Sequence, residues 1–139
     1  MEVERPTFTI SANDLAFPDD YVVNGRNMLR VGNSIIYNAV RYAGAIDNIF
    51  YGPYLTLPPS VYLFRFNGEL DGDLKIDFAA QEGRMIMRTH TIDSFLDPLC
   101  LTVTQTMPKF EVRGFRTPSL NALRLDYIAV EAIPVPTRS

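Results

Sequence analysis

The chain has 139 residues, of which 47% are hydrophobic, so it is long enough to bury the core of one domain without disulfide or metal support. Its formal net charge of −3, with no row of Lys or Arg to match a phosphate backbone, argues against a nucleic-acid partner. No stretch is apolar over a length that crosses a bilayer, and residues 1–6 lack a signal-peptide pattern, so we expect no membrane span.

The first third of the chain contains short segments with apolar residues at every second position, which is typical of β-strands. Residues 7–10 and 28–31 are predicted strands, and Asn24-Gly25 between them is a turn signal. Residues 34–46 suit either a strand or a short helix, and we interpret them as a strand.

The clearest alternation lies in residues 61–66 and 74–78, each of which places three apolar side chains on one face. Residues 67–73 between them are rich in Gly, Asn and Asp, which are typical of turns. We therefore expect an antiparallel hairpin whose turn lies at residues 67–73.

Further strands are predicted, each beside a turn cluster, at residues 84–89, 99–103, 110–113 and 123–130. Many short strands spaced roughly ten residues apart predict an all-β fold, an antiparallel β-sandwich of the jelly-roll type. We expect a single domain over residues 1–139, with an irregular tail at residues 134–139.

Two segments together resemble a known family. Residues 50–62 lead from Phe50-Tyr51-Gly52-Pro53-Tyr54 through a Leu-Pro-Pro turn into a strand, and residues 123–130 contain Leu-Asp-Tyr-Ile. This combination resembles the carbohydrate-binding-module-like jelly rolls associated with bacterial glycosyltransferases and polysaccharide enzymes. The resemblance implies a β-sandwich that binds a glycan and is not itself catalytic.

Sugar sites combine an aromatic ring, on which the apolar face of a pyranose stacks, with polar side chains that bind its hydroxyl groups. The chain has no Trp but seven Tyr. The predicted ligand-binding residues are Arg41, Tyr42, Asp47, Asn48, Tyr51 and Tyr54. Alternatively, Tyr51 and Tyr54 pack across the sandwich edge, where Gly52-Pro53 forms a bend.

The resemblance also implies a structural calcium ion, for which Asp126 of the closing strand is the matching ligand. Calcium requires several more oxygen ligands. The early candidates Glu2, Glu4, Asn13 and Asp14 lie in no matching motif. We therefore favour a solvated Asp126 and expect no cofactor.

Charged residues alternate along three of the predicted strands, and we interpret them as solvated, cross-strand pairs on an outward face. They are Lys75, Asp77, Glu111, Arg113, Arg124 and Asp126. Arg65 is a candidate to join Lys75 and Arg88 in a basic strip that faces an acidic sugar.

The residue pattern does not indicate an enzyme. His90 is the only histidine, and Cys100 alternates out of phase with its apolar neighbours, so a Cys-His nucleophile pair has no orienting partner. Asp71 and Asp73 lie in a predicted turn, where acidic residues are ordinary solvated surface.

Two functions remain. The first is recognition of a bacterial cell-surface or exopolysaccharide glycan, which the resemblance favours. The second is a structural or assembly module, whose aromatic and proline-rich lip packs against a protein partner or another copy of the chain. Because the only cysteine, Cys100, has no intramolecular partner, the sequence leaves the cellular compartment open.

Overall fold

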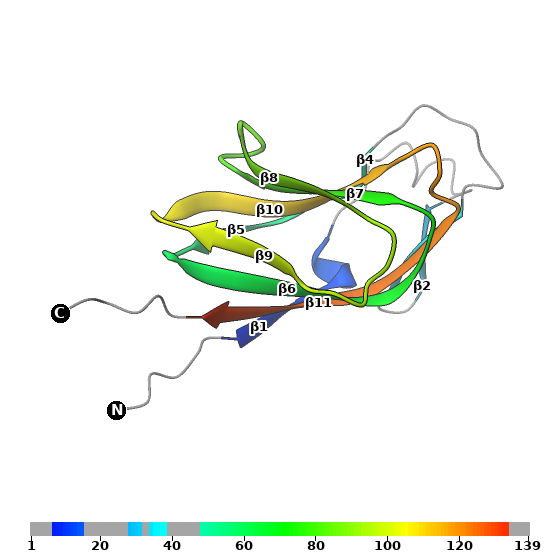
Figure 1. Ribbon diagram of the computed structural model, residues 1–139, viewed down its shortest axis with the longest axis horizontal. Helices are drawn as coiled ribbons and strands as arrows, with labels where there is room; N and C mark the ends of the chain where they lie inside the picture. The colour runs from blue at the N-terminus through cyan, green and yellow to red at the C-terminus, as the bar shows by residue number, and fades with distance from the viewer. Residues whose placement is uncertain (1–6, 16–27, 32–33, 39–47, 134–139) are drawn as a thin grey trace.

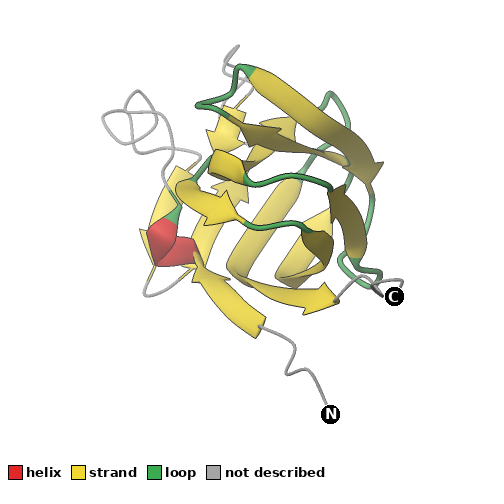
Figure 2. Cartoon of the chain, turned by 90° about the vertical axis from the view of Figure 1, so that its left-hand side faces the viewer, coloured by secondary structure: helices red, strands yellow, loops and turns green. Residues whose placement is uncertain are grey.

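The computed structural model describes residues 7–15, 28–31, 34–38 and 48–133. These residues form β-strands joined by short connections, with one helical turn, η1 (Ala12–Asp14), drawn in red in Figure 2. The strands are β1 (Thr7–Ser11), β2 (Met28–Val31), β3 (Ser34–Asn38), β4 (Asn48–Phe50), β5 (Pro53–Leu57), β6 (Ser60–Asp71), β7 (Leu74–Ala80), β8 (Met85–Ile92), β9 (Leu99–Val103), β10 (Met107–Arg116) and β11 (Ala122–Ile133).

The strands make two antiparallel sheets stacked as layers (Figure 1). The β11 sheet has the order β2-β3-β11-β6-β9, and β1 pairs with the part of β11 that follows its contact with β3. The β10 sheet has the order β4-β10-β7-β8, and β5 pairs with the part of β10 that precedes its contact with β4. The predicted all-β fold, an antiparallel β-sandwich, is confirmed.

The core lies between the sheets, because every second residue of a strand points to the same side. Tyr62, Phe64 and Phe66 of β6 are buried, as the alternation predicts. The ring of Phe64 lies 4.5 Å from that of Phe78 and 5.9 Å from that of Phe110, measured between centroids. These rings come from β6, β7 and β10, so the aromatic centre of the core joins the two layers.

The predicted hairpin between residues 61–66 and 74–78 is wrong. β6 continues to Asp71 within the β11 sheet, whereas β7 belongs to the β10 sheet, so the chain crosses between layers at Gly72. Gly72 has φ +97°, and a Cβ there would lie 2.0 Å from the backbone oxygen of Ser119. The Gly, Asn and Asp residues that resemble a turn occupy the exposed end of a long strand and a glycine-dependent crossing.

The other predicted strands are present where the structure describes them. Residues 28–31 and 99–103 match β2 and β9 in both bounds, while β8, β10 and β11 extend beyond the predicted ranges. Residues 34–38 form β3; the remainder of 34–46, the Asn24-Gly25 turn and the tail 134–139 lie outside the described residues. None of the described residues belongs to a helix with the length and hydropathy needed to cross a membrane.

Candidate functional site

Charged side chains lie on the outer face of the β10 sheet without being solvated. Asp77 lies between core residues of β7 and is paired with Arg113 of β10, so both point away from the core. Yet Asp77 is only 3% exposed and Glu111, two residues before Arg113, is 4% exposed. The interpretation of these carboxylates as a solvated face is therefore wrong, because other side chains cover them.

Arg113 is the centre of this cluster. Its Nη2 donates a hydrogen bond of 2.9 Å to Asp77 Oδ2, and its Nε lies 3.6 Å from Glu111 Oε1. Thr89 of β8 donates to the other oxygen of Asp77 at 2.8 Å. The guanidinium also lies 5.3 Å from the centroid of the Phe115 ring. These contacts offset the cost of holding two carboxylates away from water.

Glu111 is less well satisfied than Asp77. Within the described part of the chain, its Oε2 is buried and accepts no hydrogen bond. Burial raises the pKa of Glu111, although Arg113 and Tyr54 act in the opposite direction. This Oε2 oxygen is thus an acceptor that is closed to solvent and unsatisfied within the described residues.

Tyr54 and the turn after β7 cover Glu111 from two sides. The Tyr54 hydroxyl lies against the Glu111 carboxylate, which raises the pKa of Tyr54 in addition to the larger effect of burial. The Tyr54 residue nevertheless stays 50% exposed. Across the cluster, a Cβ built on Gly83 would lie 3.6 Å from Glu111 Oε1 and 3.1 Å from Arg113 Nη1. The site thus has a buried acidic floor and an exposed aromatic side.

A hollow of about 380 Å³ opens beside this cluster. Glu82 and Lys109 form an ion pair across it, and this contact lowers the pKa of Glu82. Glu82 is also close enough to Tyr54 to influence its pKa. The hollow is lined by Gln81, Glu82, Arg84, Pro108 and Lys109. We call these residues, together with Tyr54 and Glu111, the Tyr54 site.

The backbone is unusual at the same place. Tyr54, Gln81, Glu82 and Lys109 have φ of 56°, 55°, 59° and 49°, and they are the non-glycine residues with positive φ in the described part of the chain. This region is costly for residues that carry a Cβ, and such residues tend to cluster where a protein binds or reacts. The Tyr54 site thus coincides with the strained backbone of the described chain.

The structure tests only part of the predicted ligand-binding set. Tyr54 lies at the Tyr54 site, and Tyr51, half-buried, is near enough to influence the pKa of Tyr54. Asn48 lies on β4, paired with Phe115 of β10, and its buried Oδ1 lacks a hydrogen-bond partner in the described residues. Arg41, Tyr42 and Asp47 lie outside the described residues.

Sequence reasoning missed the charged part of the site. The sequence pattern assigns no functional role to Glu82, Arg84 or Lys109, and it predicts Glu111 to be a solvated strand residue. These residues come from separate strands and turns, so no spacing in the chain links them to Tyr54. No sequence signal separates Glu111 from a solvated strand residue, because a charged residue between Phe110 and Val112 is what alternation predicts for an outward position.

The predicted basic strip is also wrong. Arg65 lies on β6 of the β11 sheet, whereas Lys75 lies on β7 of the β10 sheet. Arg88 is paired with Phe78, a core residue, while Lys75 is paired with Thr91 and points outward. Because paired residues share a face, Lys75 and Arg88 lie on opposite sides of their sheet.

Asp126 makes contacts within the protein. Ser34 Oγ donates to its Oδ1 at 2.5 Å, and Arg124 Nε donates to the same oxygen at 3.2 Å. Asp14 is exposed and accepts a hydrogen bond from the Ser11 backbone amide. Across the described ranges, no group of three or more His, Cys, Asp or Glu side chains is arranged to hold a metal ion. The ligand set predicted for calcium is therefore not assembled around Asp126 in these residues.

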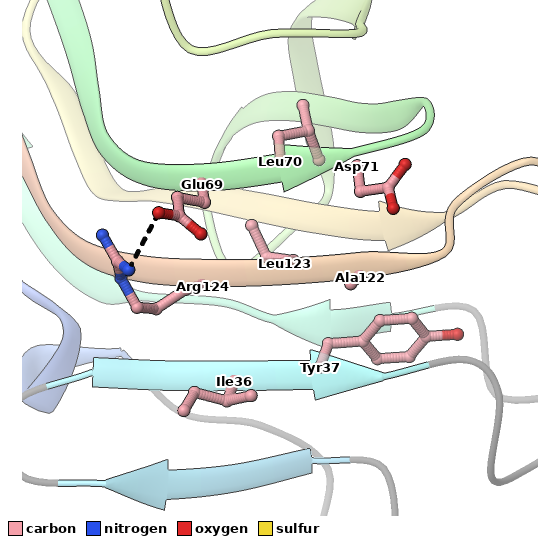
Figure 3. Close-up of a pocket in the computed structure, with 8 residues that line it drawn as sticks. All are labelled: Ile36, Tyr37, Glu69, Leu70, Asp71, Ala122, Leu123 and Arg124. Atoms are coloured by element: carbon pink, nitrogen blue, oxygen red, sulfur yellow. Dashed lines mark ion pairs between the residues drawn. The ribbon is translucent and has the colours of Figure 1, made fainter.

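A second hollow, of about 570 Å³, lies over the ends of β3, β6 and β11 (Figure 3). Arg124 and Glu69 form an ion pair of 3.3 Å along it, marked by the dashed line. Its aromatic residue, Tyr37, is fully buried and has no exposed ring face for a sugar. Because Tyr54 is half-exposed, the Tyr54 site is the better candidate for stacking. The hollow is lined by Ile36, Tyr37, Glu69, Leu70, Asp71, Ala122, Leu123 and Arg124.

Comparisons with known proteins support the fold. No protein-family model matches the chain, and no curated protein sequence matches it. Among solved structures, the chain is similar to one in the "Glycosylation Associate Protein (Gap123) complex from Streptococcus agalactiae", with a TM-score of 0.62 and 14% identity. The match covers 92% of this chain and 45% of that chain, so this chain spans less than half of its length. The resemblance to carbohydrate-binding-module-like jelly rolls remains a prediction.

Proposed function

We propose that this β-sandwich, which shares its fold with a chain of a glycosylation-associated complex, is a non-catalytic carbohydrate-binding module. Its ligand is a bacterial cell-surface or exopolysaccharide glycan. The observation that carries the proposal is the half-exposed Tyr54 ring, held beside the carboxylate of Glu111 and near Glu82, which lines a polar hollow.

The chemistry of the Tyr54 site suits a sugar. The apolar face of a pyranose packs on an aromatic ring, while fixed donors and acceptors at the rim bind its hydroxyl groups. Tyr54 supplies the ring, and the Glu82-Lys109 pair supplies an acceptor and a donor in the adjoining hollow. The buried Glu111 carboxylate contacts the Tyr54 hydroxyl and so helps to fix the position of the ring.

A structural or assembly role is the second candidate. An apolar groove of about 320 Å³ lies between β5 and the strands β1, β6 and β11. It favours contact with a protein or another copy of the chain, since apolar and aromatic surface is common at interfaces. The groove is lined by Phe8, Leu55, Thr56, Leu57, Pro58, Tyr62 and Ala132.

Substituting Tyr54 tests the first candidate. We expect Tyr54→Ala to weaken glycan binding by about tenfold or more, because the stacking ring is removed, whereas Tyr54→Phe keeps most of the affinity. Binding to a panel of bacterial and plant polysaccharides would be measured by affinity electrophoresis and calorimetry. Thermal melts would show that each variant is folded.

Tyr127→Ala is the matched control. Tyr127 is 39% exposed on β11, in the other sheet, so its loss removes a comparable ring without touching the Tyr54 site. Equal loss of binding in both alanine variants would contradict a site at Tyr54. If the folded wild-type chain bound no polysaccharide of the panel, glycan binding would be rejected and the assembly role favoured. The assembly role is tested by the oligomeric state in solution.

A further inference from the structure

The Tyr54 site and the buried Arg113 cluster beneath it contain equal numbers of acidic and basic side chains. The carboxylates are Asp77, Glu82 and Glu111, and the cations are Arg84, Lys109 and Arg113. Lys109 is paired with Glu82, and Arg113 serves both Asp77 and Glu111. Arg84 lies near Glu82 and lowers its pKa. An anionic ligand would therefore meet basic side chains that already lie near carboxylates.

The buried floor opposes further negative charge. Asp77 and Glu111 lie under other side chains, where charges are screened less than at an open surface. Among the described residues, Arg113 is the cation that pairs with both of them. A sugar carboxylate, sulfate or phosphate that stacked on Tyr54 would approach Glu111, so like-charge repulsion would act at short range.

In the part of the chain that the structure describes, the predicted basic residues do not form a strip beside the Tyr54 site. Lys75 lies 5.3 Å from the Phe115 ring centroid, on the same ring that Arg113 approaches. Arg65 is on the other sheet, and Arg88 is paired with a residue that faces the core. The cations that would have attracted an acidic polysaccharide are thus dispersed over different faces.

From this arrangement we infer that the Tyr54 site selects neutral, hydroxyl-rich glycans and discriminates against acidic ones. The inference rests on the proposed function, because it names the ligand class of the same site. A neutral pyranose donates a hydroxyl hydrogen to Glu82 and accepts a hydrogen bond from Lys109 while its apolar face lies on Tyr54. Its binding carries little dependence on salt, since no net charge is neutralised.

The test compares ligands that share a backbone and differ at C6, where a hydroxymethyl group is replaced by a carboxylate. Each neutral polysaccharide that binds is measured beside its derivative oxidised at C6, which has the same backbone with added carboxylates. We expect the oxidised form to bind about tenfold or more weakly, and we expect added salt to leave binding of the neutral form nearly unchanged.

Glu82→Gln provides the sharpest variant. It leaves Lys109 without its carboxylate partner beside Arg84, so we expect the preference for the neutral form to shrink by several-fold and binding of the oxidised form to become salt-dependent. Glu69→Gln is the matched control, since Glu69 is an exposed carboxylate paired with Arg124 on the other sheet. It should leave the preference unchanged.

The outcomes separate the two proposals. Tighter binding of acidic glycans by the wild-type chain, weakened by salt and by Tyr54→Ala, overturns the inference and leaves the glycan-binding proposal intact. An unchanged preference in Glu82→Gln also overturns it. Failure of the folded wild-type chain to bind either form overturns the proposed function, and the inference falls with it.

Discussion

On the outer face of the β10 sheet, two buried carboxylates differ in the hydrogen bonds that they accept. Asp77 accepts hydrogen bonds from Arg113 and Thr89, whereas Glu111 has a buried oxygen that accepts none within the described residues. The pKa of Glu111 is raised by burial. The two buried acids therefore differ in how completely the protein satisfies them, and an unsatisfied buried acceptor favours the protonated form.

His90 provides a second residue whose protonation is governed by burial. It packs edge-on against Phe78, and its Nε2 is buried without a hydrogen-bond partner in the described chain. Burial, with a smaller effect of Arg88, lowers the pKa of His90. Cys100, the residue considered as a nucleophile beside His90 in the sequence analysis, is exposed on β9 in the other sheet. His90 therefore packs within the β10 sheet, against Phe78 of β7.

The lowered pKa predicts how stability depends on pH. The unfolded chain binds the His90 proton at about pH 6.5, above the folded pKa, so stability falls as the pH drops below that value. We expect His90→Gln to flatten this part of the profile. Unfolding by urea at pH about 7.5 and about 5.5 would check it; the same acid loss in both proteins would contradict the assignment.

Glycines determine where the chain crosses from one sheet to the other and where a side chain packs closely on a strand. Gly72 lets the chain leave β6 for the opposite sheet, and the Asp73 carboxylate beside it accepts a hydrogen bond of 2.7 Å from Ser119 Oγ. Gly114 of β10 leaves room for the Phe50 ring, whose Cε2 would lie 2.2 Å from an added Cβ. Both contacts join segments distant in the chain.

Gly72→Ala should be strongly destabilising. The new Cβ meets the Ser119 backbone oxygen and holds a positive φ, so we expect a loss of about 3 kcal/mol or more in the free energy of unfolding. Gly83→Ala is the control: its φ of +83° is also positive, but its nearest contact is the end of the Arg113 side chain at 3.1 Å. We expect about 1 kcal/mol there. If denaturant titrations gave similar losses of unfolding free energy for Gly72→Ala and Gly83→Ala, the proposed role of Gly72 at the crossing between the sheets would be contradicted.

Over the whole molecule, the two sheets present different outer faces. The outer face of the β10 sheet carries the Tyr54 site, whereas the β11 sheet carries the exposed ion pairs of Arg124 with Glu69 and Asp126. The apolar groove lies at the β1 and β5 side, where both sheets have edge strands. The two proposed functions therefore involve different surfaces, although β5 contributes to both: Tyr54 to the Tyr54 site and Leu55 to the apolar groove.

Metal independence is a prediction for the whole fold. The described residues assemble no carboxylate group for calcium, and Asp126 already accepts hydrogen bonds from Ser34 and Arg124. We expect the melting temperature and glycan binding to be unchanged by added calcium or by a chelator. A rise in melting temperature with calcium, lost in Asp126→Asn, would restore the predicted metal site.

The sequence by itself determined most of the strands, although not β4 or β5, and the buried face of β6. Alternation has a period of two residues and is local, so β6 could be predicted to bury Tyr62, Phe64 and Phe66 without knowing its partners. Tertiary structure alone decided which strands pair, and therefore that β6 and β7 lie in different sheets. It also decided that Glu111 and Glu82 meet at Tyr54, because those contacts depend on long-range pairing and on burial by side chains remote in the chain.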